Sequence, residues 1–230
     1  MRILALFSLI LALAAPVVAQ EPVVVELFTS QGCSSCPPAD AFAHDLVARE
    51  PAVIVLAWHV DYWDYLGWKD VFSSREATAR QEGYRQRWKL RSLYTPQIVV
   101  HGEAQAVGSK RAEVSMYIES FQAEAPMLSF DLKSENGVAG ALITPLVSDL
   151  PAAEVVIVRV TPEAQTMIER GENAGNTFTY VNVVREMTWL ADWDGKDPVV
   201  VEGVELDGDR YVLLVQAKDF GPILGARYLN

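Results

Sequence analysis

The sequence predicts an α/β domain followed by a mainly antiparallel β-sandwich domain, and three patterns support this expectation. Residues 23–28 and 53–58 are nearly continuous apolar runs, which are typical of strands buried on both faces of a sheet. Between them, apolar residues recur at three- and four-residue spacing, which predicts an amphipathic helix. From about residue 126 onward this spacing gives way to short alternating runs separated by turns, as in β-sandwiches.

The N-terminus has the pattern of an export signal. After Arg2, residues 3–15 are almost wholly apolar, and small residues precede Gln20 at the positions that signal peptidase recognises. We therefore expect residues 1–19 to be a signal peptide, cleaved between Ala19 and Gln20, and the mature protein to be periplasmic or secreted. A retained N-terminal anchor is the alternative, although the apolar run is short for a membrane-spanning helix.

Charge and length restrict the partners and the domain organisation. Removing residues 1–19 takes away Arg2 and no acidic residue, so the formal net charge changes from −11 to −12. Such an acidic chain is not expected to bind nucleic acid or, after signal removal, a membrane. The mature chain is long enough for two domains, which we place at residues 20–125 and 126–230, the second packed on the first. The oligomeric state stays open.

The two cysteines of the chain, Cys33 and Cys36, stand two residues apart between the first predicted strand and the first predicted helix. This placement brings the first sulfur near unsatisfied amide N–H groups and the positive end of the helix dipole, which both favour thiolate. We therefore predict Cys33 to be an exposed nucleophile and Cys36 to be the inner, resolving thiol. A static disulfide, half of a metal site and a pair of buried structural thiols are the competing interpretations.

An aromatic and acidic stretch, residues 59–68, follows the second predicted strand. Two strands joined by a helix are expected to be parallel, and α/β sheets bind ligands beyond the carboxyl ends of such strands. Trp63 and Trp68 are therefore candidates for a substrate-binding wall beside the sulfurs. Packing of both rings under a loop is an equally good interpretation.

The rest of the first domain shows two more helix signals with a predicted hairpin between them. Ser73-Ser74-Arg75-Glu76 is a capping box, which predicts a helix that continues to about Leu93. We interpret its basic residues as a solvated face: Arg75, Arg80, Arg85, Arg87, Lys89 and Arg91. A strand over residues 97–100, a hairpin into residues 104–108 and a helix stripe over residues 114–121 follow. Pro96 fits either a strand start or a cis turn.

The order strand, Cys-x-x-Cys, helix, strand, helix, Thr-Pro, hairpin, helix resembles the thioredoxin fold. The dipeptide Thr95-Pro96 matches the position of the cis-proline that faces the dithiol in that family. By this resemblance Thr95 presents its backbone to an extended substrate segment, and the first domain is thioredoxin-like. The sequence departs from ordinary thioredoxins at Gly32, where they have tryptophan, and at Ser34-Ser35, where they have Gly-Pro.

A closer resemblance rests on two segments, Glu26-Leu27-Phe28-Thr29-Ser30-Gln31-Gly32-Cys33-Ser34-Ser35-Cys36-Pro37-Pro38-Ala39-Asp40 and Arg170-Gly171-Glu172-Asn173. They resemble a bacterial family of secreted thioredoxin-like proteins with no assigned function, the domain of unknown function 1223 (DUF1223). The resemblance extends over essentially the whole mature chain. It implies a fold and a compartment more than a reaction.

In the second domain we expect strands at residues 155–160, 178–187, 199–204 and 211–216, and a hairpin at Asn136-Gly137. The polar loop at residues 170–176 lies between two of these strands. It fits a binding loop that reaches the dithiol, but a loop held by its own hydrogen bonds is the interpretation that we prefer.

The sequence thus predicts an exported thiol–disulfide oxidoreductase that acts on protein or small-molecule thiols and disulfides and needs no cofactor. Cys33 attacks, Cys36 resolves, and Glu26 shuttles the proton of Cys36 if it is buried behind the pair. The dipeptide between the cysteines has no histidine, so we expect a moderately lowered pKa of Cys33 and a reducing or isomerising couple.

Two other classes of function remain open. The two cysteines together with His59 would suit a soft metal ion such as Cu(I), which predicts a metal carrier. A non-catalytic binding module, in which the disulfide is only a structural clasp, is the third possibility.

Overall fold

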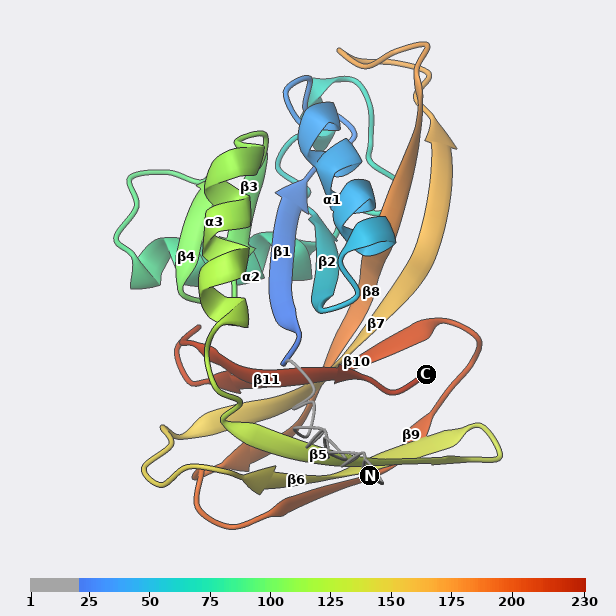
Figure 1. The fold of residues 1–230 in the computed structure, drawn as a ribbon. Helices are drawn as coiled ribbons and strands as arrows, with labels where there is room; N and C mark the ends of the chain where they lie inside the picture. Colours follow the sequence, from blue (N-terminus) through green and yellow to red (C-terminus); the bar gives the residue numbers. More distant parts are fainter. Residues whose placement is uncertain (1–20) are drawn as a thin grey trace, which may run out of the picture.

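The computed structural model of the chain describes residues 21–230 (Figure 1). The predicted signal peptide and its cleavage site lie outside the described residues. The first part of the chain contains β1 (Val23–Thr29), α1 (Pro37–Arg49), β2 (Val53–His59), the 3-10 helix η1 (Asp64–Leu66), α2 (Arg75–Arg87), β3 (Gln97–Val100), β4 (Ala104–Val107) and α3 (Arg111–Gln122). The strands that follow are β5 (Leu128–Glu135), β6 (Val138–Pro145), β7 (Ala153–Met167), β8 (Thr177–Trp193), β9 (Val199–Glu205), β10 (Arg210–Ala217) and β11 (Ile223–Tyr228).

Most predicted elements of the first part are present. β1 and β2 pair in parallel, as expected for two strands joined by a helix, and all residues of both strands are buried. The Ser74 hydroxyl caps α2 by accepting a hydrogen bond from the N–H of Ala77 at 3.0 Å. α2 ends at Arg87, earlier than predicted, because the chain turns at Lys89, whose φ is positive.

The prediction of a thioredoxin-like domain followed by a separate sandwich is wrong. One eight-stranded mixed sheet runs through both parts in the order β11-β10-β7-β8-β2-β1-β3-β4, and β5, β6 and β9 form a second, three-stranded sheet. β8 joins the two parts, because it pairs antiparallel with β7 and parallel with β2, where Ala57 lies opposite Val183. Figure 1 shows the β7–β8 hairpin extending along β2 toward the N-terminal end of α1.

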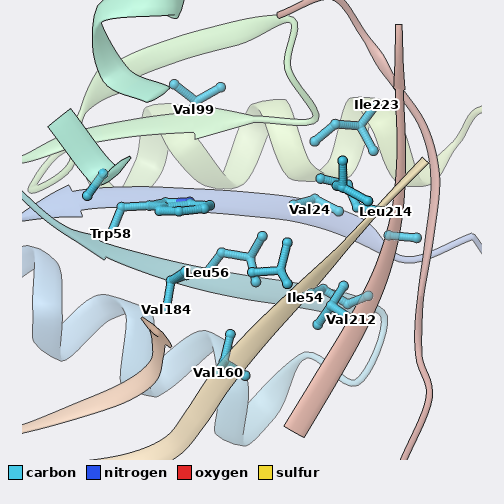
Figure 2. Packing of buried hydrophobic residues seen from close by; sticks show 14 of the residues in the cluster. Val24, Ile54, Leu56, Trp58, Val99, Val160, Val184, Val212, Leu214 and Ile223 are labelled. Atoms are coloured by element: carbon cyan, nitrogen blue, oxygen red, sulfur yellow. The ribbon is translucent and has the colours of Figure 1, made fainter. Parts of the chain in front are cut away.

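The hydrophobic core confirms that the two parts are continuous. One cluster combines residues of β1 and β2 with residues of β10 and β11. Figure 2 shows several of its side chains packed in the same region: Val24, Ile54, Leu56, Val212, Leu214 and Ile223. Each of these side chains is at most 1% exposed. A second cluster lies between the sheet and helices α1 and α3, and a third lies between the two sheets.

A buried ion pair crosses this core. Glu26 of β1 binds the guanidinium of Arg80 and the hydroxyl of Tyr84, both from α2, while Arg80 also donates to Oε1 of Gln216 in β10 at 2.9 Å. Glu26 and Arg80 are 0% and 4% exposed. The interpretation of Arg80 as part of a solvated face is therefore wrong, since a buried partner outweighs the preference of arginine for water.

In residues 21–230, no helix is both long and apolar enough to cross a membrane.

Replacing Arg80 should destabilise the protein strongly. We expect Arg80→Ala to lower the free energy of unfolding by about 3 to 5 kcal/mol, because it leaves the Glu26 carboxylate buried without its cation. Urea unfolding measures this loss. The control is Arg85→Ala on the same helix, whose surface pair with Glu82 contributes little to stability, so this loss should be much smaller. Equal losses for both variants would contradict this assignment.

Candidate functional site at the Cys33–Cys36 disulfide

Cys33 and Cys36 form a disulfide at the N-terminal end of α1, with Cα atoms 5.4 Å apart. The turn closes through two hydrogen bonds, from the N–H of Cys33 to the carbonyl of Ser30 at 3.1 Å and from the N–H of Cys36 to the carbonyl of Cys33 at 3.2 Å. Cys36 is the N-cap, and Pro37 and Pro38 are the first two helical residues. Since proline has no N–H, this helix end offers fewer free donors to a thiolate than most.

Both cysteines are buried in the disulfide form. Cys33 is 2% exposed and Cys36 0%, whereas Ser34 and Ser35 between them are exposed. The expectation of an exposed Cys33 is therefore wrong. Segments that are far away in the sequence contact the dithiol turn, and the pattern around the cysteines does not predict them.

The first covering segment is the aromatic stretch after β2. The indole of Trp63 donates to the hydroxyl of Thr95 at 2.8 Å, and a Cβ at Gly32 would lie 3.2 Å from that of Trp63. The indole of Trp68 donates to Oε1 of Gln31 at 2.8 Å. Both tryptophans thus lie beside the dithiol turn, where the sequence placed them. Their role in substrate binding stays a prediction.

The predicted Thr-Pro dipeptide also reaches the cysteine turn. The hydroxyl of Ser35 donates to the carbonyl of Thr95 at 3.4 Å. A Cβ added at Gly108 would contact both Pro96 and Ala39, which places Pro96 against the first turn of α1. The peptide bond between Thr95 and Pro96 is cis.

The second covering segment is the tip of the β7–β8 hairpin. The amide of Asn173 donates to the carbonyls of Gln31 and Cys33 at 2.9 and 3.0 Å, and this side chain is buried. The tip is also held by its own bonds, such as that from the N–H of Gly175 to the carbonyl of Ile168 at 2.8 Å. The polar loop therefore reaches the dithiol turn through Asn173 and is also held by its own hydrogen bonds, so each of the two interpretations describes part of it.

Glu26 does not lie with the cysteines. Side chains alternate along a strand, so Val25 and Leu27 face α1 whereas Val24, Glu26 and Phe28 face α2. α1 carries the cysteines, and the carboxylate of Glu26 is bound to Arg80 on the other face of the sheet.

Asp40 is the acidic residue that the structure places near Cys36, and the sequence analysis missed it. It lies one turn further along α1, and its N–H donates to the carbonyl of Cys36 at 3.1 Å. Its carboxylate accepts a hydrogen bond from the Thr29 hydroxyl at 2.8 Å. Burial raises the pKa of Asp40 to about 7, against the opposing effects of His59 and Thr29. The spacing of four residues between Cys36 and Asp40 could have predicted that the two lie on the same face of the helix.

A buried histidine–aspartate pair lies next to Asp40. Nδ1 of His59 is 2.7 Å from Oδ2 of Asp70, which also accepts the N–H of Gln31 at 2.8 Å. Burial opposes ionisation of Asp70, but His59 and the backbone N–H groups of Gln31 and Phe72 outweigh it and lower the pKa of Asp70. Nε2 of His59 is buried and has no hydrogen-bond partner among the described residues.

The predicted metal ligands Cys33, Cys36 and His59 have other partners in this structure. Among residues 21–230, no group of three or more His, Cys, Asp or Glu side chains is placed to hold a metal ion. The two sulfurs are bonded to each other, and His59 is bound to Asp70 through Nδ1.

Fold and site together define a class: a mixed α/β protein in which a Cys-x-x-Cys disulfide begins a helix and is covered by a long hairpin. The family model for proteins of unknown function DUF1223 matches residues 24–216, and the chain belongs to this family. The comparison with curated proteins gave no match.

Two solved structures are similar to this chain. Protein AGR_C_4864 from Agrobacterium tumefaciens shares 29% sequence identity with a TM-score of 0.78, and the match covers 92% of this chain and 96% of that one. HBP35 of Porphyromonas gingivalis shares 18% identity with a TM-score of 0.62 over 91% of this chain and 74% of that one. The second similarity concerns the fold alone.

Removing the Asn173 amide should make the disulfide easier to reduce. Asn173→Ala breaks two hydrogen bonds to the dithiol turn, each worth about 1 kcal/mol, so we expect dithiothreitol to reduce the disulfide roughly ten- to a hundredfold faster. The control is Glu172→Ala, an exposed neighbour in the same tip, which should leave the rate unchanged. An unchanged rate in Asn173→Ala would show that the hairpin tip does not protect the disulfide.

The raised pKa of Asp40 predicts a pH-dependent stability. Between about pH 4 and pH 7 the folded protein holds a proton on Asp40 that the unfolded chain has lost, so raising the pH in this window destabilises the fold. The slope from one such group is at most about 1.4 kcal/mol per pH unit. Urea unfolding at several pH values should show this loss in the wild-type protein and a smaller one in Asp40→Asn. Parallel curves would mean that Asp40 is ionised throughout.

Proposed function

We propose that this protein is a thiol–disulfide oxidoreductase of an oxidising compartment outside the cytoplasm. The observation that carries the proposal is the position of the Cys33–Cys36 disulfide, which links residues only three apart at the start of α1. In the chain-entropy view such a short loop gains the least stability from a cross-link. Yet segments as distant as Trp63, Thr95 and Asn173 surround this turn.

The chemistry follows from the place of each sulfur. In the reduced protein the Cys33 thiolate attacks a substrate disulfide, so that a mixed disulfide forms and one substrate thiolate leaves. The Cys36 thiolate then attacks the Cys33 sulfur, which reforms the Cys33–Cys36 bond and releases the second substrate thiolate. The substrate gains two electrons and the protein loses two. The opposite sequence of steps oxidises a substrate dithiol.

The N-terminal end of α1 supports a moderate activation of Cys33. The positive end of the helix dipole favours a thiolate, but Pro37 and Pro38 remove two of the N–H donors that would bind it. A thiolate that is only weakly stabilised adds little stability to the reduced form, so the disulfide form is favoured. This agrees with a reducing or isomerising direction.

Access to the sulfurs requires movement of the cover. The two serines between the cysteines are exposed, so the turn itself is at the surface. Cys33 is only 2% exposed, and the Asn173 and Trp63 segments contact the turn at Cys33 and Gly32. Substrates are therefore thiols or disulfides of proteins or small molecules that reach the turn between these two segments.

The burial of both cysteines favours a second candidate function. A disulfide that never opens would act as a clasp for the dithiol turn, and the protein would then be a non-catalytic binding module. A metal carrier that uses Cys33, Cys36 and His59 has no comparable support, because the two sulfurs are bonded to each other and His59 is bound to Asp70.

The reduction potential separates the two candidates. Equilibration with defined thiol–disulfide buffers should give a potential between about −270 and −120 mV, the range of thioredoxin-type and oxidising catalysts. A structural disulfide falls below about −300 mV. A value in that lower range would remove the enzymatic proposal and leave the binding module.

Single-cysteine variants test the roles of the two sulfurs. Cys33→Ser should abolish turnover of a disulfide substrate, because it removes the nucleophile. Cys36→Ser should instead accumulate a mixed disulfide on Cys33, visible by mass spectrometry. Ser34→Ala, an exposed position in the same turn, is the control and should retain turnover. Trapping on Cys36 rather than Cys33 would reverse the assignment.

A further inference from the structure

Asp40 is a buried carboxyl group to which no cation is directly bound. It is 6% exposed, and among the described residues it takes part in no ion pair; the hydrogen bond to its carboxylate comes from Thr29. A buried carboxylate that lacks a cation is costly, and burial favours its protonated form. Packing alone gives no reason for an acid at this position, because the neighbouring buried residues of α1 are apolar: Ala39, Phe42, Ala43 and Leu46.

The position of Asp40 relates it to one sulfur. Residues four apart in a helix lie one above the other, with Cβ atoms about 5 to 6 Å apart. Helical side chains lean toward the N-terminus, so the Asp40 carboxyl group leans toward the turn that ends in Cys36. The N–H of Asp40 already bonds the carbonyl of Cys36, which fixes this register. Both side chains are buried, Cys36 at 0% and Asp40 at 6% exposed.

The groups that act on Asp40 come from each element packed around it. β1 supplies the Thr29 hydroxyl, β2 supplies His59, the segment before α2 supplies Asp70, and β8 supplies Tyr180. His59 and Asp70 are bound to each other, so their charges oppose one another at Asp40. The cluster therefore leaves Asp40 free to gain or lose a proton near neutral pH, since no neighbour holds it permanently in one form.

We propose that Asp40 accepts the proton of Cys36 when the disulfide forms and returns it when the disulfide opens. This inference rests on the proposed function. In the forming direction, the Asp40 carboxylate takes the proton of the Cys36 thiol, directly or through one water molecule. The resulting thiolate attacks the Cys33 sulfur, the Cys33–Cys36 bond forms, the bond from Cys33 to the substrate sulfur breaks, and the substrate leaves as a thiolate. The proton stays on Asp40.

The reverse direction uses the same proton. When a substrate thiolate attacks the Cys33 sulfur, Cys36 leaves as a thiolate in a buried site, where its charge is unfavourable. The Asp40 carboxylic acid gives its proton to that sulfur and becomes a carboxylate. Cys33 needs no such partner, because its thiolate lies at the positive end of α1.

A single-turnover reaction with an aromatic disulfide reagent, a dithiobis-nitrobenzoate, tests the proposal. The reduced protein releases a first coloured thiolate when Cys33 attacks and a second when Cys36 resolves the mixed disulfide. We expect Asp40→Asn to leave the first phase unchanged and to slow the second about a hundredfold at pH 7, as for loss of a general base. In the wild-type protein the second phase should rise with pH near neutrality, and in Asp40→Asn only toward the pKa of an ordinary cysteine, about 8.5.

The control variant is Asp45→Asn, which removes a surface carboxylate of the same helix, paired with Arg111, and should change neither phase. Thr29→Val provides an independent measurement if Asp40→Asn fails to fold. It removes the hydrogen bond that lowers the pKa of Asp40, so the second phase should shift to higher pH.

The two phases separate this inference from the proposed function. A first phase no faster than that of free cysteine overturns the oxidoreductase itself. A fast first phase, with a second phase whose pH dependence is the same in wild type, Asp40→Asn and Thr29→Val, overturns only the role of Asp40.

Discussion

The parallel pairing of β8 with β2 is the interaction on which the rest of the structure depends. β2 is buried along its whole length, so the N–H and C=O groups of its second edge need partners that water does not supply. A strand from the second half of the chain pairs with this edge, with Ala57 opposite Val183. This pairing merges two sets of elements into one sheet, closes a shared core and carries the β7–β8 hairpin to the cysteine turn.

The candidate site lies at the end of that sheet, and the segments that form it are far apart in the sequence. Gln31 shows this most clearly: its N–H binds Asp70, its carbonyl binds Asn173 and its side chain accepts from Trp68. The residue two positions before Cys33 thus joins the aromatic stretch, the hairpin tip and the dithiol turn. The disulfide is covered because these three segments meet on it, and its chemistry depends on how they separate.

Local signals in the sequence predicted local structure well, but they did not predict which distant segments pair with each other. Asn136-Gly137 forms its hairpin because both residues adopt positive φ, a property of those residue types. The apolar run of β8 carries no information about which strand it joins or in which direction. Glu26 faces Arg80, away from the cysteines, because one residue of register reverses the direction of a side chain along a strand. The ion pair of Arg80 depends on a partner that is fifty-four positions away.

The origin of β8 in the second half of the chain has a consequence for protein synthesis. A chain that grows from its N-terminus completes β1, α1 and β2 long before residue 177 exists, and until then one side of β2 has no neighbour. Such an open side is a template for strands of other molecules. The nascent first half is therefore at risk of self-association for as long as the remainder is missing, and delayed folding until the whole polypeptide is available would remove that risk.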